Sequence, residues 1–179
     1  MEGFEVKPYR SPYEAYPFLC DPDDDLRCDF EIATDRMASR AGLLAALVPD
    51  RREELLRVDE LIYHANPTLR TRFTVTGEEI AWLAGQVEAL KRDTEGLCER
   101  FVLPAGSPRS CVAHDLRVQG KALVRLVYRH CERTGDHQEQ LIDLLSLLSE
   151  YFFLLALWLN REDGFRELPF ESRNYPRKD

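Results

Sequence analysis

One stretch decides the fold: residues 138–160, which read QEQLIDLLSLLSEYFFLLALWLN. Apolar side chains recur at helical spacing along two stripes, one beginning with Leu141 and Leu145 and the other with Leu144 and Leu147. A helix that is apolar around most of its circumference has to be covered on most sides. The stretch therefore predicts the central helix of an all-α bundle, and burial against other subunits is a natural way to complete the cover.

The same stretch raises the question of a membrane span. Asp143 and Glu150 lie inside it, and a charge at the middle of a bilayer costs roughly 2.5–3.5 kcal/mol. Residues 1–10 lack the basic start and apolar run of a signal peptide. The five cysteines are odd in number, and no pair has the spacing of metal ligands. We therefore expect a cytoplasmic chain with reduced thiols and no membrane contact.

The length and charge of the chain further limit the number of domains and the classes of ligand to be expected. Its 179 residues suffice for one domain with a sizeable core. Its formal net charge of −8 disfavours binding to the phosphates of nucleic acids. The four histidines are not clustered as zinc ligands would be, so no metal site is expected.

Four further helices are expected before the central one. Apolar residues at helical spacing predict helices over residues 29–48 and 51–65. Thr76 with Glu79 has the pattern of a capping box, which predicts the start of a third helix that runs to about Arg92.

The last two helix starts also have local signals. Ser107 followed by Pro108 has the pattern of a helix cap and a first-turn proline, and the helix that it begins should end before Gly135. Asp136 with Glu139 repeats the capping-box pattern and is expected to start the central helix. Together these patterns predict a five-helix bundle.

We expect three segments along the chain. Residues 1–27 should form an irregular arm, residues 28–165 the five-helix bundle, and residues 166–179 a C-terminal tail. The arm carries aromatic residues that we expect to pack on the body, and an acidic run that lacks the glycine and distal glutamate of a calcium loop and is interpreted as solvated. These residues are Tyr9, Tyr13, Tyr16 and Phe18, and Asp21, Asp23, Asp24 and Asp25.

Two helices carry a polar stripe where a bundle helix is usually apolar. His114, Arg117 and Lys121 are spaced to lie on one face of the fourth helix, and Ser146 and Glu150 on one face of the fifth. Polar residues on the inner faces of bundle helices can mark a ligand site between them. The alternative is that Arg117 and Glu150 belong to structural ion pairs within or between subunits.

Several short motifs resemble those of one enzyme family. Residues 101–107, FVLPAGS, resemble its F-(I/V)-L-P-G-G-(S/T) loop, and His114 with Arg117 resembles its L-H-x-x-R motif. Residues 147–153, LLSEYFF, resemble R-L-S-D-x-L-F. Asp35, with a glycine seven residues later, resembles V-D-E-L-N-x-x-x-G.

Over residues 29–164 the chain therefore resembles the propanediol-utilisation type of ATP:cob(I)alamin adenosyltransferase. The resemblance implies a trimer of five-helix bundles with active sites between subunits, where the 5′-deoxyadenosyl group of ATP is transferred to cobalt(I). It implies that Phe101 presses on the lower face of the corrinoid and that Asp35 pairs with Arg117 across the subunit boundary. The cofactor-binding residues expected on this basis are Phe101, Asp35, Arg117, His114, Lys121, Ser146, Ser149 and Glu150.

The chain departs from the family pattern where ATP is expected to bind. The glycine-rich phosphate loop is missing, because no glycine occurs between Gly3 and Gly42. The family's R-R-x-E motif keeps neither its first arginine, which becomes Lys121, nor its glutamate, which becomes Val124. In place of an asparagine and two arginines the chain has Ser146, Leu147 and Leu157.

The leading hypothesis is a corrinoid-binding protein of this family that has little or no transferase activity and stores, delivers or senses cobalamin. Cobalamin is the expected cofactor, and the missing motifs put ATP and magnesium in doubt. A homotrimer is expected, with a cobalamin-dependent enzyme or chaperone as a further partner. Two alternatives stay open: an active adenosyltransferase with a rebuilt ATP site, and a non-enzymatic helical scaffold trimer.

Overall fold

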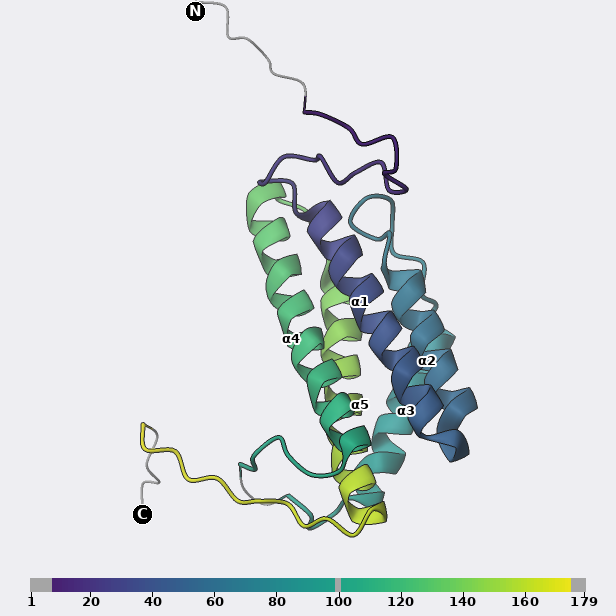
Figure 1. Ribbon diagram of the computed structural model, residues 1–179, viewed down its shortest axis with the longest axis vertical. Coiled ribbons are helices and arrows are strands. Elements are labelled where there is room, and N and C mark those ends of the chain that lie inside the picture. Colours follow the sequence, from purple (N-terminus) through teal and green to yellow (C-terminus); the bar gives the residue numbers. More distant parts are fainter. Residues whose placement is uncertain (1–7, 99–100, 175–179) are drawn as a thin grey trace, which may run out of the picture.

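Five α-helices make up the bundle in the computed structural model, which describes residues 8–98 and 101–174 (Figure 1). They are α1 (Leu26–Leu47), α2 (Arg52–Ala65), α3 (Gly77–Asp93), α4 (Pro108–Thr134) and α5 (Glu139–Glu162), with a 3₁₀ turn, Pro49–Arg51, between the first two. No strand occurs in these two ranges, and the predicted all-α five-helix fold is confirmed. Residues 1–7 of the predicted arm and 175–179 of the predicted tail lie outside the described residues.

The central element is α5, which packs against both α3 and α4. By length and composition α5 alone, within the described part of the chain, is apolar enough to cross a membrane, yet 61% of its most apolar window is buried inside the bundle. Core burial therefore accounts for the apolar surface that the sequence pattern revealed. Its buried side chains include Leu141, Leu144, Leu145, Leu148, Tyr151, Phe152 and Leu155.

A second packing layer is built on α1, which contacts both α2 and α4 (Figure 1). Phe30, Met37 and Leu44 from α1 are fully buried, and Leu55 and Ile62 from α2 meet them in the same apolar core. This packing leaves the opposite face of α1 in solvent.

Local capping explains where the helices begin. The Thr76 side chain accepts a hydrogen bond from the N–H of Glu79, and the Glu79 carboxylate accepts one from the N–H of Thr76 (2.7 Å), so the predicted capping box is confirmed. Ser107 caps α4 and Pro108 occupies its first turn, also as predicted. Gly135 ends α4 in the left-handed conformation, with φ at 76°.

The start of α1 differs from the prediction. The helix begins at Leu26, three residues before the expected Asp29. The Asp25 carboxylate accepts a hydrogen bond from the N–H of Arg27 (3.1 Å) and caps the helix there. The last two residues of the predicted arm are therefore helical.

The capping box predicted for Asp136 and Glu139 at the start of α5 is wrong. Asp136 follows the left-handed Gly135, and its carboxylate lies 3.4 Å from His130 of α4 instead of facing α5. The helix begins after Gln138 without a side-chain cap.

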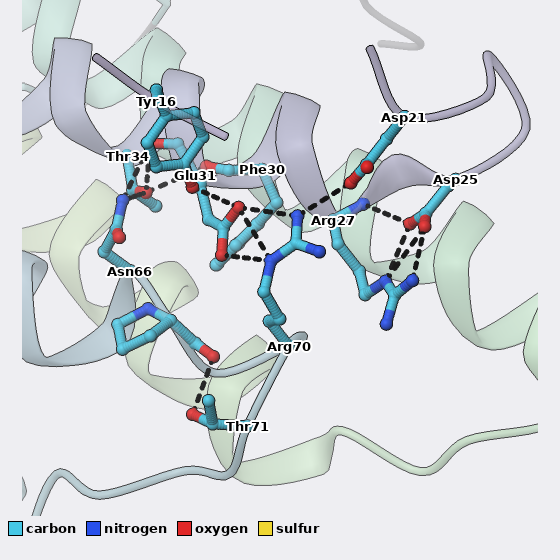
Figure 2. A network of polar contacts seen from close by, with 11 residues as sticks. Tyr16, Asp21, Asp25, Arg27, Phe30, Glu31, Thr34, Asn66, Arg70 and Thr71 are labelled. Atoms are coloured by element: carbon cyan, nitrogen blue, oxygen red, sulfur yellow. Dashed lines mark hydrogen bonds and ion pairs between the residues drawn. The ribbon is translucent and has the colours of Figure 1, made fainter. Parts of the chain in front are cut away.

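A buried ion-pair network fastens the arm to the bundle, as Figure 2 shows. Glu31 on α1, only 5% exposed, accepts hydrogen bonds from two nitrogens of Arg70 (2.8 and 2.9 Å). Arg70 also donates to Asp21 of the arm (3.0 Å), and its guanidinium lies 3.6 Å from the centre of the Phe18 ring. Tyr16 of the arm donates a hydrogen bond to Glu31 as well. The arm is thereby held at the start of α1.

Two expectations for the arm need correction. Tyr9 and Tyr13 are exposed and do not pack on the body, whereas Tyr16 and Phe18 further along the arm contact Glu31 and Arg70. The acidic run is also not wholly solvated. Asp21 is paired in the network and Asp25 caps α1, so only part of its negative charge is free to repel an anion.

The network should dominate the stability of this end of the bundle. Arg70→Met strands the buried Glu31 carboxylate, and breaking a buried pair in this way costs about 3 kcal/mol or more. Arg40→Met, which removes the exposed pair with Asp115 (2.9 Å), is the matched control and should cost less than about 1 kcal/mol. Urea unfolding followed by circular dichroism measures both. Equal losses in the two variants would contradict the buried network.

Candidate functional site

A cavity of about 1300 Å³ lies between α4, α5, the loop that begins at Phe101 and the segment that follows α5. It is larger than the roughly 300–1,000 Å³ of most small-molecule sites. Its wall combines aromatic and aliphatic side chains with cations from α4. The lining residues are Cys98, Phe101, Val102, Pro104, His114, Arg117, Lys121, Val124, Arg125, Ser146, Ser149, Glu150, Phe153, Phe170, Glu171 and Ser172.

The loop over residues 101–107 is fixed by one side chain from the end of α5. Asn160 is buried, donates a hydrogen bond to the carbonyl of Ala105 (2.9 Å) and accepts one from the N–H of Ser107 (3.0 Å). Gly106 lies between these two residues with φ at 137°, and a Cβ there would stand 1.9 Å from the Asn160 Oδ1 atom. Only glycine allows the loop to approach Asn160 this closely.

The segment after α5 folds back along the same loop. The N–H of Leu103 donates to the carbonyl of Leu168 (2.9 Å), and the N–H of Phe170 donates to the carbonyl of Phe101 (2.7 Å). This short antiparallel bridge brings Phe170 and Glu171 to the cavity wall.

This contribution was not predicted, because residues 166–179 were expected to form only a C-terminal tail. The available signal was the cluster of apolar residues Phe165, Leu168 and Phe170 so soon after a helix. Arg109 strengthens the junction by pairing with Asp163 at 2.6 and 2.8 Å.

Seven of the eight residues predicted for the site line this cavity. Asp35 is the exception, because it lies on α1 and accepts a hydrogen bond from the Tyr63 hydroxyl of α2 (2.7 Å). Its expected pair with Arg117 is therefore not formed within the chain, and a pair between subunits stays a prediction. The seven are Phe101, His114, Arg117, Lys121, Ser146, Ser149 and Glu150.

Close packing of α4 on α5 forms the floor of the cavity. A Cβ at Gly120 would lie 3.2 Å from the Cβ of Ser149, so the two helices meet with little space between them. The Ser149 hydroxyl donates a hydrogen bond to the carbonyl of Arg117 (3.0 Å). Ser149 thus ties the two helices together.

Glu150 is paired at the edge of the cavity. Its carboxylate lies 2.9 Å from the Lys91 amine of α3, which also contacts Glu88 at 3.0 Å. The structural ion pair considered for this residue is therefore present within the chain.

The inner part of the cavity is built around the Phe153 ring. The Arg117 guanidinium lies 5.9 Å from the centre of this ring, and the His114 ring lies 6.4 Å from it. Burial, reinforced by the positive charge of Arg117, lowers the pKa of His114 to about 4. The imidazole is therefore neutral at pH 7.

The charged groups of the wall are mostly cations. Lys121 and Arg125 project from α4, and the apolar Val124 stands between them in sequence. Nowhere in residues 8–98 and 101–174 do three or more His, Cys, Asp or Glu side chains gather closely enough to hold a metal ion. The arrangement suits a large ligand with apolar faces and a polar rim.

The fold and the cavity define a class, namely five-helix bundles that have a large cavity between two core helices and a fixed loop. Residues 21–159 match the sequence profile of the cobalamin adenosyltransferases. The chain therefore belongs to the cobalamin adenosyltransferase family. It is also 25% identical over 159 residues to the corrinoid adenosyltransferase of Bacillus subtilis (strain 168), which covers 83% of this chain and 81% of that protein.

Solved structures of the same fold are similar to the chain over most of its length. A phenylalanine-to-histidine variant of the PduO-type ATP:corrinoid adenosyltransferase from Lactobacillus reuteri, complexed with cobalamin and ATP, matches with a TM-score of 0.72 at 18% identity, over 84% of this chain and 86% of that one. An arginine-to-lysine variant of that enzyme, complexed with ATP, matches with a TM-score of 0.71 at 19% identity, over 82% and 88% of the two chains.

Gly106→Ala should release the loop from α5. The new Cβ would clash with Asn160, and a non-glycine residue at this positive φ adds strain, so we expect a loss of at least about 2 kcal/mol. Gly135→Ala is the matched control, because Gly135 also has a positive φ but no described residue comes within 4 Å of where its Cβ would stand, and it should cost about 1 kcal/mol. Thermal unfolding compares the two. A smaller loss at Gly106 than at Gly135 would contradict the role given to Asn160.

Proposed function

We propose that this cavity binds a corrinoid and that the protein stores, delivers or senses cobalamin, with little or no adenosyl transfer. The observation that carries the proposal is the position of Phe101. Phe101 is 82% exposed and lines the cavity from a loop that Asn160 and the C-terminal segment hold in place. An exposed aromatic ring on a fixed loop at the edge of a large cavity is suited to cover the flat apolar face of a ligand.

Two further aromatic side chains support the same ligand class. Phe153 from α5 and Phe170 from the C-terminal segment line the cavity with Phe101. A corrin ring offers wide apolar faces and a rim of polar side chains, which matches aromatic walls bordered by charged residues. In this proposal Phe101 covers the lower face and excludes the lower ligand of cobalt.

We propose that the chain binds nucleotide weakly, because residues that would hold magnesium and phosphate are missing. Val124 provides no carboxylate for magnesium, and Lys121 offers a single ammonium where a guanidinium would grip phosphate in a fork. The arm adds no glycine loop, and it is fastened at the far end of α4, where Arg133 donates to the carbonyl of Asp24 (3.0 Å). Within one chain the described part of the arm therefore does not line the cavity.

An active adenosyltransferase is the second candidate. It is favoured by the three cations that α4 places on the cavity wall, Arg117, Lys121 and Arg125, and by the activity named for the relatives. It requires phosphate contacts from a source other than a glycine loop. The third candidate is a scaffold that binds neither ligand. A scaffold function would leave a cavity of this size unexplained.

We also propose that the site is completed by a neighbouring subunit in a homotrimer. Exposed apolar residues Ile32 and Leu43 lie on the same face of α1 as Asp35, and Val118 and Tyr128 lie on the face of α4 that carries Lys121. Two different apolar faces, each next to a charge of opposite sign, suit a head-to-tail ring.

We also propose a cytoplasmic location. The described cysteines form no disulfide, which is in keeping with it.

Cobalamin titration tests the proposed ligand. Purified protein should change the visible spectrum of cobalamin towards a form without the lower ligand, and Phe101→Ala should return a lower-ligand-bound or water-bound spectrum or lose binding. Phe165→Ala, an exposed phenylalanine outside the cavity lining, is the control and should behave as the wild type. An unchanged cobalamin spectrum at high protein excess would move the scaffold hypothesis to first place.

Calorimetry with MgATP tests the nucleotide half of the proposal. Each lost charge-assisted hydrogen bond is worth about 1.5–3 kcal/mol, so losing three weakens affinity by roughly three to six powers of ten at about 1.4 kcal/mol per power. We expect no binding at millimolar nucleotide. Lys121→Arg combined with Val124→Glu should bind more tightly than the wild type. A micromolar dissociation constant for the wild type would favour the active enzyme.

Light scattering tests the assembly. We expect three copies of the 20.8 kDa chain, and Asp35→Ala should weaken the trimer because it strands Arg117 of a neighbouring copy, a loss of about 3 kcal/mol when the pair is fully buried. Asp23→Ala in the exposed arm is the control. A monomeric wild type, or a trimer unaffected by Asp35→Ala, would remove the proposed pair between subunits.

A further inference from the structure

His114 is a buried polar side chain that faces the cavity without a partner. Its side chain is 4% exposed and lines the cavity, and neither ring nitrogen has a hydrogen-bond partner among the described residues. Buried polar atoms in native proteins are nearly always hydrogen-bonded, and those that are not point to a missing ligand, water or subunit. Two unpaired nitrogens on one buried ring therefore identify a position where a polar group of a ligand is expected.

Arg117 adds a third unpaired atom to the same place. Its Nε atom is buried and lacks a partner among the described residues, and both its guanidinium and the His114 ring lie beside Phe153. Arg117 follows His114 by one helical turn, so the two side chains project from the same face of α4. Together they place unpaired polar atoms beside Phe153 in the wall of the cavity.

We propose that His114 and the Nε atom of Arg117 receive one carboxamide side chain of the bound corrinoid. This inference rests on the proposed function, since it assigns a subsite within the same cavity. It separates two tasks: the aromatic residues hold the face of the ring, and the His114–Arg117 pair holds one point on its rim. That point sets how the ring is rotated in the cavity.

The chemistry of the pair matches an amide. A neutral imidazole has one N–H donor and one nitrogen that accepts, and the lowered pKa of His114 keeps it neutral at physiological pH. The Arg117 Nε–H is a donor only, and it leaves the terminal NH₂ groups of the guanidinium for the proposed pair with Asp35 of a neighbouring subunit. A carboxamide can accept from Arg117 through its oxygen and donate to the free nitrogen of His114 through its NH₂ group. A carboxylate has acceptors only and would leave that nitrogen unpaired.

Titration with cobinamide, which has the corrin amides but no lower nucleotide, tests the subsite. His114→Leu removes the hydrogen bond between the ring and the carboxamide and should weaken cobinamide binding about tenfold, the loss expected for one buried hydrogen bond. His114→Gln keeps a donor and an acceptor and should stay within about threefold of the wild type. His137→Leu makes the same change at an exposed histidine outside the cavity and should have no effect.

The outcomes separate this inference from the proposed function. If the wild type fails to bind cobinamide, the proposed function fails and the subsite with it. If the wild type binds and a folded His114→Leu variant binds equally well, the subsite alone is wrong. Dissociation of the assembly by His114→Leu in light scattering would place His114 at a subunit contact and overturn the inference. Tighter binding of cobyrinic acid than of cobinamide would do the same, because a carboxylate would then be the preferred partner.

Discussion

The hydrogen bonds of Asn160 connect the core of this protein to its cavity. α5 is buried because it is apolar on most sides, and its last turns place Asn160 against the loop that begins at Phe101. Gly106 permits the contact, and the loop in turn pairs with the C-terminal segment. The same helix thus supplies the hydrophobic core and sets the position of the aromatic wall, so the stability of the bundle and the shape of the cavity depend on one another.

Features of the fold that depend only on residues close together in the sequence could be predicted. The caps at Thr76 and Ser107 each involve a residue three positions further along the chain, and the apolar stripes of α5 required only helical spacing. Asp136 has the same local pattern, yet the left-handed Gly135 before it and His130 of α4 decide where its carboxylate lies. The cap at Asp25 could not be predicted, because Asp25 stands in a run of aspartates and the local pattern did not distinguish which of them caps the helix.

Most residues of the site could be predicted, because they lie on two facing helices and in one loop motif. Helical spacing brought His114 and Arg117 to the cavity wall, but no local pattern revealed that their nitrogens would be unpaired. The pairing of Leu103 with Leu168 joins segments far apart in the chain, and so does the pairing of Glu31 with Arg70. Such contacts follow from the packing of the whole bundle. Asp35 faces away from the cavity of its own chain, so its proposed role requires a second copy.

Membership of the cobalamin adenosyltransferase family and a cavity bordered by Phe101 lead to one central claim, that this chain holds a corrinoid whose lower ligand is displaced. Electron paramagnetic resonance of cob(II)alamin tests it most directly, because the lower nitrogen ligand splits the cobalt signal. With protein in excess, we expect a signal that has lost this splitting. A spectrum identical to that of free cob(II)alamin would contradict the claim.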